Sequence, residues 1–327
     1  MDAFAQIESN RLRFHQMNQK KLRAELYNGL QDAILGGTDL SDIGQRVILP
    51  SSFTGSPRHM VQLYQDAMAI VGETSNPDLF ITFTGNPQWP EITEALLAGQ
   101  IPQDRADIVS RVFKLKLNAL CKELFDKHVL GGVRARMHVI EFQKRGLPHA
   151  HILIILNPES KARTVEDIDS IVCAEIPDPN EQPHLYGIIT RCMVHGPCGA
   201  IKPNAQCMKD GKCSKRYPRT FSEATLLDEN SYPVYRRHNN GRTFIKEGFE
   251  YDNRWVVPYN PYLSAKYNAH INVEIATTIT SVKYLYKYVY KGGDRATAEI
   301  RQPERDETKL YIDGRYVSSP EGKLLSP

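Results

Sequence analysis

Apolar and polar residues follow their clearest pattern between residues 139 and 156. Two largely apolar runs, 139–142 and 151–156, flank a short polar stretch at 144–146 that is followed by Pro148. Runs of this kind, separated by Gly and Pro, are typical of two strands joined by a turn. The pattern therefore predicts a β-hairpin in this part of the chain.

Further elements follow from the same reading. Apolar residues recur at helical spacing in 104–126 and around Leu22, Leu26 and Leu30. Helices are predicted at 3–37, 59–71, 104–126 and 164–172. Strands are predicted at 78–84, 133–142, 151–156, 255–257 and 269–275. An Asn-Asn-Gly sequence at 239–241, between two strand-like runs, favours a further hairpin.

Two histidines, His149 and His151, lie at the start of the second strand of the first hairpin. Because side chains alternate between the two faces of a strand, both imidazoles share one face and Ala150 lies on the other. Glu141 and Gln143 likewise share one face of the preceding strand. Imidazoles joined by a carboxylate or an amide, with coordination positions left open, are typical of a catalytic divalent-metal site. The plain alternative is an amphipathic strand without a metal.

The sequence Glu-Phe-Gln-Lys-Arg-Gly-Leu-Pro-His-Ala-His at 141–151 resembles the histidine–hydrophobe–histidine (HUH) motif of rolling-circle Rep endonucleases. It is most similar to the N-terminal Rep domain of Helitron transposases, and the similarity covers nearly the whole chain. The resemblance implies an α+β fold in which a central antiparallel sheet carries the histidines and is flanked by helices. We place the Rep domain at 51–327, after an N-terminal helical segment at 1–50 and with a zinc-binding insertion at 190–220.

Four tyrosines alternate between residues 281 and 292. Apolar residues there recur three or four apart, which predicts a helix: Ile279, Val282, Tyr286 and Val289. Tyr284 and Tyr288 share the opposite face of that helix, near Lys287. Two amphipathic surface tyrosines are the plain alternative. Helitron-type Rep domains carry a tyrosine pair that maps onto Tyr284 and Tyr288, and Lys287 is placed to favour a phenolate beside it.

The strand at 78–84 runs into a Gly- and Pro-rich loop that contains Asn86 and Trp89. This arrangement resembles the first Rep motif, and we predict that both residues contact DNA. An exposed Trp89 would stack on an unpaired base. The alternative, equally open, is that Trp89 fills the edge of the core.

A loop-rich segment between residues 192 and 213 gathers four of the six cysteines. His195, Cys198, Cys207 and Cys213 offer the donor atoms of a structural zinc site, with Cys192 as a spare ligand. Free thiols in a loop are the alternative. Basic residues surround the segment and are our candidates for contacts with DNA phosphates: Lys209, Lys212, Lys215, Arg216 and Arg219.

Composition narrows the class of protein. A net charge of +3 is too small to indicate nucleic-acid binding, so any basic surface must be local. No apolar run is long enough to span a bilayer, and the first residues do not resemble a secretory signal. We therefore expect an intracellular protein, nuclear if its substrate is DNA, whose cysteines bind metal.

The strand at 269–275 carries His270, Asn272 and Glu274 on a polar face, which we expect to face solvent, with approach to the metal as the alternative.

The resemblance implies a metal-dependent endonuclease and strand transferase that acts on single-stranded DNA, at transposon ends and target, through a 5′-phosphotyrosine link. It assigns Glu141 as the third ligand beside His149 and His151, with Gln143 as the alternative, and Mg²⁺ or Mn²⁺ suits such donors. A helicase domain is expected in the full-length protein, but no ATP-binding loop occurs in this chain. The rival functions are a non-cleaving single-stranded-DNA-binding domain and a zinc-organised nucleic-acid adaptor.

Overall fold

The computed structural model describes residues 2–19, 47–54, 56–74, 76–142, 147–227, 233–276 and 308. Its α-helices are α1 Asp2–Met17, α4 Pro57–Thr74, α5 Pro90–Thr93, α6 Ala106–Phe125, α7 Val165–Ile171, α8 Pro183–Cys192 and α9 Pro261–Tyr267. Its strands are β1 Leu79–Thr84, β2 Val133–Phe142, β3 Pro148–Leu156, β4 Met208–Lys209, β5 Lys212–Cys213, β6 Phe244–Lys246, β7 Phe249–Tyr251 and β8 Ile271–Ile275. Short 3₁₀ helices span Pro102–Arg105, Pro158–Ser160 and Asn253–Trp255.

The chain divides into two compact units, Met1–Ala69 with Tyr286–Pro327, and Ile70–Leu285. In the first unit, Leu12 of α1 is buried together with Leu49 and Phe53. The side chain of Gln19 accepts a hydrogen bond from the backbone of Ile48 and donates one back to it. The division at residue 50 between a helical segment and a Rep domain stays a prediction.

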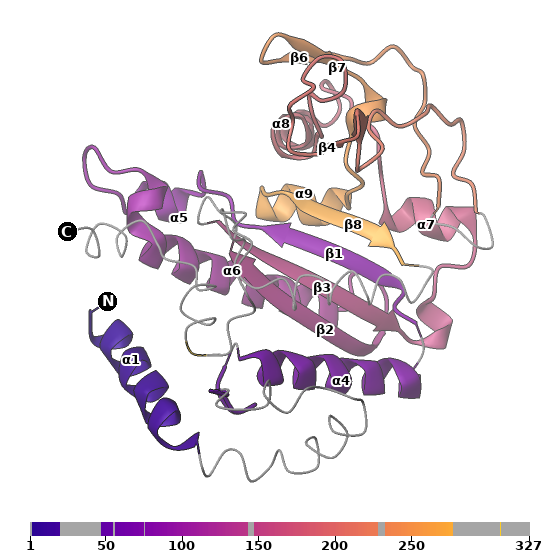
Figure 1. Cartoon of the computed structure of the whole chain (residues 1–327). Helices are drawn as coiled ribbons and strands as arrows, with labels where there is room; N and C mark the ends of the chain where they lie inside the picture. Colours follow the sequence, from indigo (N-terminus) through magenta and orange to yellow (C-terminus); the bar gives the residue numbers. More distant parts are fainter. Residues whose placement is uncertain are drawn as a thin grey trace. The chain divides into compact units, whose positions relative to one another are not determined.

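The second unit is built on a four-stranded sheet with the order β2-β3-β1-β8 (Figure 1). Each of its three strand pairs is antiparallel. The hairpin of β2 and β3 supplies one edge, and β1 separates β3 from β8. The predicted α+β fold with a central antiparallel sheet flanked by helices is therefore confirmed.

One face of this sheet packs into the main hydrophobic core. Alternate residues of the strands point to this face, among them Ile81, Phe83, Ile152 and Val273. The apolar stripe of α6 covers them: Val109, Val112, Phe113, Leu117, Leu120 and Leu124. Because neighbouring residues of a strand alternate, the residues between these buried ones lie on the other face, and this second face carries the histidines.

Two local predictions are wrong. The Asn-Asn-Gly sequence at 239–241 does not close a hairpin. Val234 and Arg237 instead pair with Leu226 and Ser222, and the hairpin that follows, β6–β7, turns at residues 247–248. The predicted strand at 255–257 contributes the end of a 3₁₀ helix and one bridge, from Val256 to Val194.

Other boundaries agree with the sequence patterns or extend them. β2 covers the predicted residues 133–142, and β3 begins earlier than predicted, at Pro148. Three α-helices were not predicted, α5, α8 and α9. Within the described residues, no helix is both long and apolar enough to cross a bilayer. Residues 20–37 of the first predicted helix lie outside the described part of the chain, as does the whole tyrosine segment.

Candidate functional site

Strand register places the two predicted histidines between two other strands. On β3, His149 is paired with Glu141 of β2 on one side and with Thr84 of β1 on the other. His151 is paired with Thr82 of β1. All of these side chains lie on the face of the sheet opposite α6. The structure therefore brings Glu141 to both predicted histidine ligands.

The threonines contact one nitrogen of each imidazole. Thr82 Oγ1 lies 3.2 Å from Nδ1 of His151, and Thr84 Oγ1 lies 3.5 Å from Nδ1 of His149. A threonine hydroxyl can accept a hydrogen bond from the N–H at Nδ1. In that tautomer the lone pair of Nε2 is available to a metal. Oε2 of Glu141 lies 3.4 Å from Nε2 of His151, and the two imidazole centroids are 6.2 Å apart.

Burial sets the protonation state of both imidazoles. It is the main cause that lowers the pKa of His149 to about 3, with smaller contributions from His270 and His151. Burial and then the charge of Lys215 lower the pKa of His151 to about 4. Both side chains are therefore neutral at pH 7, the form in which imidazole binds a metal.

The donor set fits a divalent cation. Nε2 of His149 is buried and has no hydrogen-bond partner within the described residues. A buried polar atom left without a partner costs about 1–3 kcal/mol, and a bound ion or water removes that cost. Glu141, whose side chain is 29% exposed, adds a negative charge at the rim. Gln143, the alternative third ligand, lies outside the described residues.

β8 adds residues that the sequence did not assign to this site. The backbone N–H of Thr84 donates to the carbonyl of His270 at 2.9 Å, and Asn272 is paired with Thr82. His270 is half-buried, and its Nδ1 is buried without a hydrogen-bond partner among the described residues. Burial lowers its pKa to about 4. The expectation that this strand face points to solvent is therefore wrong for His270. Nδ2 of Asn272 donates to Glu274 at 3.2 Å.

The predicted zinc ligands converge. The donor atoms of His195, Cys198, Cys207 and Cys213 all lie within 4.8 Å of one another. Sγ of Cys213 is 3.4 Å from Nε2 of His195. A tetrahedral site with Zn–S of about 2.3 Å and Zn–N of about 2.0 Å would separate such atoms by about 3.5 Å. Burial and the neighbouring thiols raise the pKa of Cys198 to about 12, so a cation is needed to hold it as a thiolate at neutral pH.

Local backbone geometry explains how the loop brings these residues together. Asp210 and Gly211 both have positive φ, 49° and 74°, as a tight two-residue turn between antiparallel strands requires. This turn joins β4 to β5, and β5 ends at Cys213. Gly196 has a φ of 115°, and a Cβ at this position would come within 2.9 Å of the Trp255 ring. Glycine is therefore required there for the chain to pass between His195 and Cys198.

Cys192 is not part of this cluster. It is the last residue of α8 and packs, half-buried, against the core formed around Ile189, Met193 and Tyr259. The proposed spare ligand is thus held at a separate position in the described structure, and the four first-choice residues form the cluster without it.

The prediction that Asn86 and Trp89 contact DNA is wrong. Trp89 is 1% exposed, its Nε1 donates to the carbonyl of Tyr267 at 2.8 Å, and its ring packs near Phe83. It fills the edge of the core, which was the alternative interpretation. Asn86 is also buried, and its amide donates to the carbonyl of Asn268 and accepts from the N–H of Gln88. Both side chains hold the loop after β1 to the end of α9.

All five predicted basic residues are exposed, as a surface for DNA requires: Lys209, Lys212, Lys215, Arg216 and Arg219. They are not equivalent. Lys209 and Lys212 lie on either side of the β4–β5 turn. The charge of Lys215 contributes, after burial, to the lowered pKa of His151.

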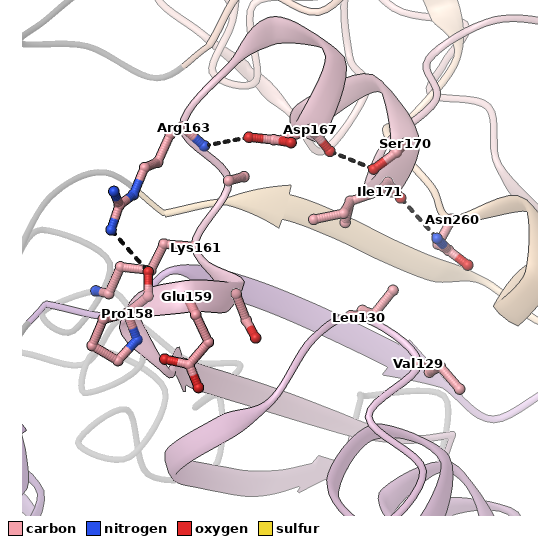
Figure 2. A pocket seen from close by; sticks show the side chains of 12 residues that line it. Val129, Leu130, Pro158, Glu159, Lys161, Arg163, Asp167, Ser170, Ile171 and Asn260 are labelled. Atoms are coloured by element: carbon pink, nitrogen blue, oxygen red, sulfur yellow. Dashed lines mark hydrogen bonds between the residues drawn. The ribbon is translucent and has the colours of Figure 1, made fainter.

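A cavity of about 460 Å³ lies beyond the other end of β3 (Figure 2). Three of the charged side chains that line it, Lys161, Arg163 and Asp167, interact with neighbouring residues. Lys161 pairs with Asp78 at 2.9 Å, and Arg163 donates to the carbonyl of Pro158 at 2.9 Å. Asp167 accepts hydrogen bonds from backbone N–H groups at the start of α7. This hollow therefore shows a network that stabilises the loop, and the candidate site is the histidine face.

The proposed nucleophiles Tyr284 and Tyr288, and Lys287 beside them, lie outside the described residues and stay predictions.

Residues 1–154 match the model of the family described as the Helitron helicase-like domain at the N-terminus. The match includes Glu141, His149 and His151, together with the strand β1 that supports them. No curated protein matches the chain. Residues 1–154, a little under half of the chain, are therefore similar to Helitron helicase-like N-terminal domains, which relates this protein to Helitron transposases.

Proposed function

We propose that this chain is a metal-dependent endonuclease and strand transferase that nicks and joins single-stranded DNA for a rolling-circle Helitron-type transposase. The observation that supports it most is the gathering of His149, His151 and Glu141 on one face of the sheet, with both imidazoles neutral. A purely amphipathic strand would not explain why a buried and a half-buried imidazole lie beside a carboxylate. The match of residues 1–154 to the Helitron helicase-like family model supports the same function.

His149, His151 and Glu141 are the residues that would hold Mg²⁺ or Mn²⁺. When bound, such a cation supplies Lewis-acid stabilisation of the negative charge on the scissile phosphate. Thr82 and Thr84 contribute by orienting the imidazoles through Nδ1. The buried face keeps these groups in one arrangement, so little reorganisation is needed when DNA arrives.

Tyr284 and Tyr288 are the proposed nucleophiles, on the strength of the family resemblance. A phenol has a pKa of about 10, so attack at neutral pH needs help, and Lys287, which is next to Tyr288 in the sequence, would favour the phenolate. The phenolic oxygen forms a bond to phosphorus while the bond from phosphorus to the 3′ oxygen breaks. The products are a 5′-phosphotyrosine and a free 3′-hydroxyl, which takes up a proton. A later attack by another 3′-hydroxyl reverses the link and joins the strands, and a second tyrosine allows two ends to be held.

The remaining components follow from this function. The substrates are single-stranded transposon ends and target DNA, and the activity belongs in the nucleus. A helicase domain in the full-length protein would unwind the duplex. Structural Zn²⁺ is assigned to the cluster of His195, Cys198, Cys207 and Cys213, whose geometry suits it.

A covalent adduct tests the proposed chemistry directly. Wild-type protein incubated with labelled single-stranded DNA and Mn²⁺ should give a labelled protein band that survives denaturation. The double variant Tyr284→Phe/Tyr288→Phe should give none, because no phenol remains to bond to phosphorus. Tyr286→Phe is the matched control and should keep the adduct. Adducts formed by the double variant would refute the assignment, and wild-type binding without an adduct would favour the non-cleaving alternative.

The third ligand can be tested by comparing two neighbouring residues. Glu141→Ala is expected to weaken metal-dependent cleavage by at least the ~10–100-fold that loss of a supporting group costs at a metal site. Gln143→Ala should change it little. Mn²⁺ titrations of the cleavage rate measure both effects. The choice of Glu141 is wrong if Gln143→Ala raises the metal requirement while Glu141→Ala leaves it unchanged.

A further inference from the structure

The segment that contains the Cys/His cluster is hydrogen-bonded toward the central sheet through successive backbone contacts. The N–H of His195 donates to the carbonyl of Trp255 at 2.9 Å, and the N–H of Val257 donates to that of Met193 at 2.8 Å. Directly after Val257, the carbonyl of Pro258 accepts from the N–H of Val273 in β8 at 3.1 Å. The cluster is thus attached to the β8 edge of the sheet.

These contacts lead to the residues that orient the histidine ligands. Tyr259 forms a bridge with Asn272 of β8, and Asn272 is paired with Thr82 of β1. The hydroxyl of Thr82 is the group 3.2 Å from Nδ1 of His151. The Cys/His segment and the histidine pair therefore have a fixed relative position, because each step between them is a backbone pairing or a hydrogen bond.

The turn at residues 214–219, which follows Cys213 and contains Lys215, Arg216 and Arg219, is fixed by backbone hydrogen bonds at both of its ends. The N–H of Ser214 donates to the carbonyl of Cys207 at 2.7 Å, and the N–H of Arg216 donates to that of Cys213 at 2.8 Å. Further on, the N–H of Arg219 donates to the carbonyl of Arg254 at 3.0 Å. Two of these bonds end on cysteines of the cluster, so the conformation of the turn depends on the cluster.

Side-chain stacking also fixes the turn at residues 214–219. The ring of Tyr217 stacks on the imidazole of His195, with centroids 4.3 Å apart and an interplanar angle of 19°. The guanidinium of Arg219 lies 5.1 Å from the centroid of the Tyr217 ring. A cluster ligand, an aromatic ring and a cation are therefore layered on one another. A metal ion that fixes the imidazole of His195 would therefore also restrict Arg219, through the ring of Tyr217.

Lys215 lies in the middle of this turn and is exposed, as is Arg219 near its end. Lys209 and Lys212 belong to the β4–β5 hairpin on the other side of Cys213 and are not part of this turn.

We propose that Lys215 and Arg219 bind the phosphates of the DNA strand that enters the histidine site, and that the Cys/His cluster holds them in position. This inference rests on the proposed function and selects two of the five exposed basic residues. Exposed cations on a segment whose position relative to the histidine pair is fixed would attract and align the backbone of a single strand without reading its sequence. The competing explanation is that these cations only offset the negative charge of the cysteine thiolates.

Binding of a fluorescent single-stranded oligonucleotide, followed by anisotropy over a range of salt concentrations, tests the proposal. The double variant Lys215→Gln/Arg219→Gln should bind at least about 10-fold more weakly. The slope of log Kd against log salt concentration should fall by about 1.4, because two phosphate contacts are lost and each contributes about 0.7 to the slope for single strands. Zinc content, measured by mass spectrometry, should stay at the wild-type value.

Two matched controls make the result specific. Lys209→Gln/Lys212→Gln removes the same charge from the neighbouring hairpin, and Lys122→Gln removes an exposed charge from α6 on the opposite face of the sheet. Both should bind DNA as the wild type does. Wild-type protein stripped of zinc should show the reduced salt dependence, and stripping the Lys215/Arg219 variant should add little.

Several outcomes overturn the inference. They are unchanged binding by the Lys215/Arg219 variant, equal weakening by Lys209→Gln/Lys212→Gln, or loss of zinc from the Lys215/Arg219 variant. The last of these would support the charge-offset explanation. Because binding is measured without cleavage, a protein that binds through these residues but never cuts would refute the proposed nuclease and leave this inference standing.

Discussion

Alanine at His149 or His151 is expected to reduce metal-dependent cleavage of single-stranded DNA by about 10²–10³-fold, the loss that follows removal of one group that stabilises transition-state charge. His151 is buried and His149 is half-buried, both imidazoles are neutral, and each is held through Nδ1, so no neighbouring side chain can take its place by a simple rotation. Single-turnover cleavage rates at saturating Mn²⁺ measure the effect, and Mn²⁺ titrations show whether affinity is lost.

The variant Thr84→Val tests the same site with a smaller change. It removes the hydroxyl beside Nδ1 of His149 and keeps the size of the side chain, so a smaller loss of about 10–100-fold in metal affinity is expected. His184→Ala, at an exposed position on α8, should have no effect. If His149→Ala and His151→Ala cleave as fast as His184→Ala, the buried histidines serve the sheet and not the reaction.

Loss of zinc is expected to have the largest effect on stability. Zinc binding to small zinc-finger peptides contributes about 10–16 kcal/mol at pH 7, and most of it appears as folding free energy. Among the described residues, three buried apolar side chains form the small core beside the cluster, Cys198, Tyr251 and Trp255, so it cannot replace that contribution. Cys207→Ser, or chelation of the wild type, should therefore open the segment 195–219 to proteolysis.

Zinc stoichiometry and limited proteolysis measure this effect, and two other cysteines provide controls. Cys192→Ser and Cys121→Ser should retain one zinc per chain, since neither thiol belongs to the cluster of His195, Cys198, Cys207 and Cys213. Zinc retained by Cys207→Ser but lost from Cys192→Ser would show that the ligand set is the alternative one.

The features that the sequence predicted correctly depend on residues close together in the chain. The hairpin of β2 and β3 follows from local alternation of apolar residues, and it already contains Glu141, His149 and His151. The Cys/His cluster likewise lies within one short loop-rich segment. Donor type and spacing were enough to find it, because such a segment has few apolar residues with which to form an ordinary core.

The features that the sequence missed depend on pairings between distant strands. Thr82 and Thr84 alternate on β1, and this is a usable signal, but only the register with β3 shows that they meet the histidines. The side of the sheet on which His270 lies depends in the same way on the pairing of β8 with β1. Neither register can be read from a strand in isolation.

The failed turn at 239–241 shows tertiary contacts overriding a local preference. Arg237, just before this turn, is buried, and its guanidinium donates to the carbonyls of Ala174, Asn253 and Val256. These bonds hold the segment against other parts of the chain and prevent it from pairing with the residues that follow the turn. Trp89 was undecided from sequence for a similar reason, because its partner Tyr267 is contributed by a distant helix.

The division of labour between the β2–β3 hairpin and β1 has a consequence for how the protein matures. All three proposed donors come from neighbouring chain segments, whereas the hydroxyls that orient them lie 65 and 69 residues away in the sequence. A nascent chain could thus assemble a loose cation-binding hairpin early, but tight and selective binding would wait until β1 docks beside β3. Metal affinity would then report completed folding, and a chain with a misplaced first strand would remain inert toward DNA.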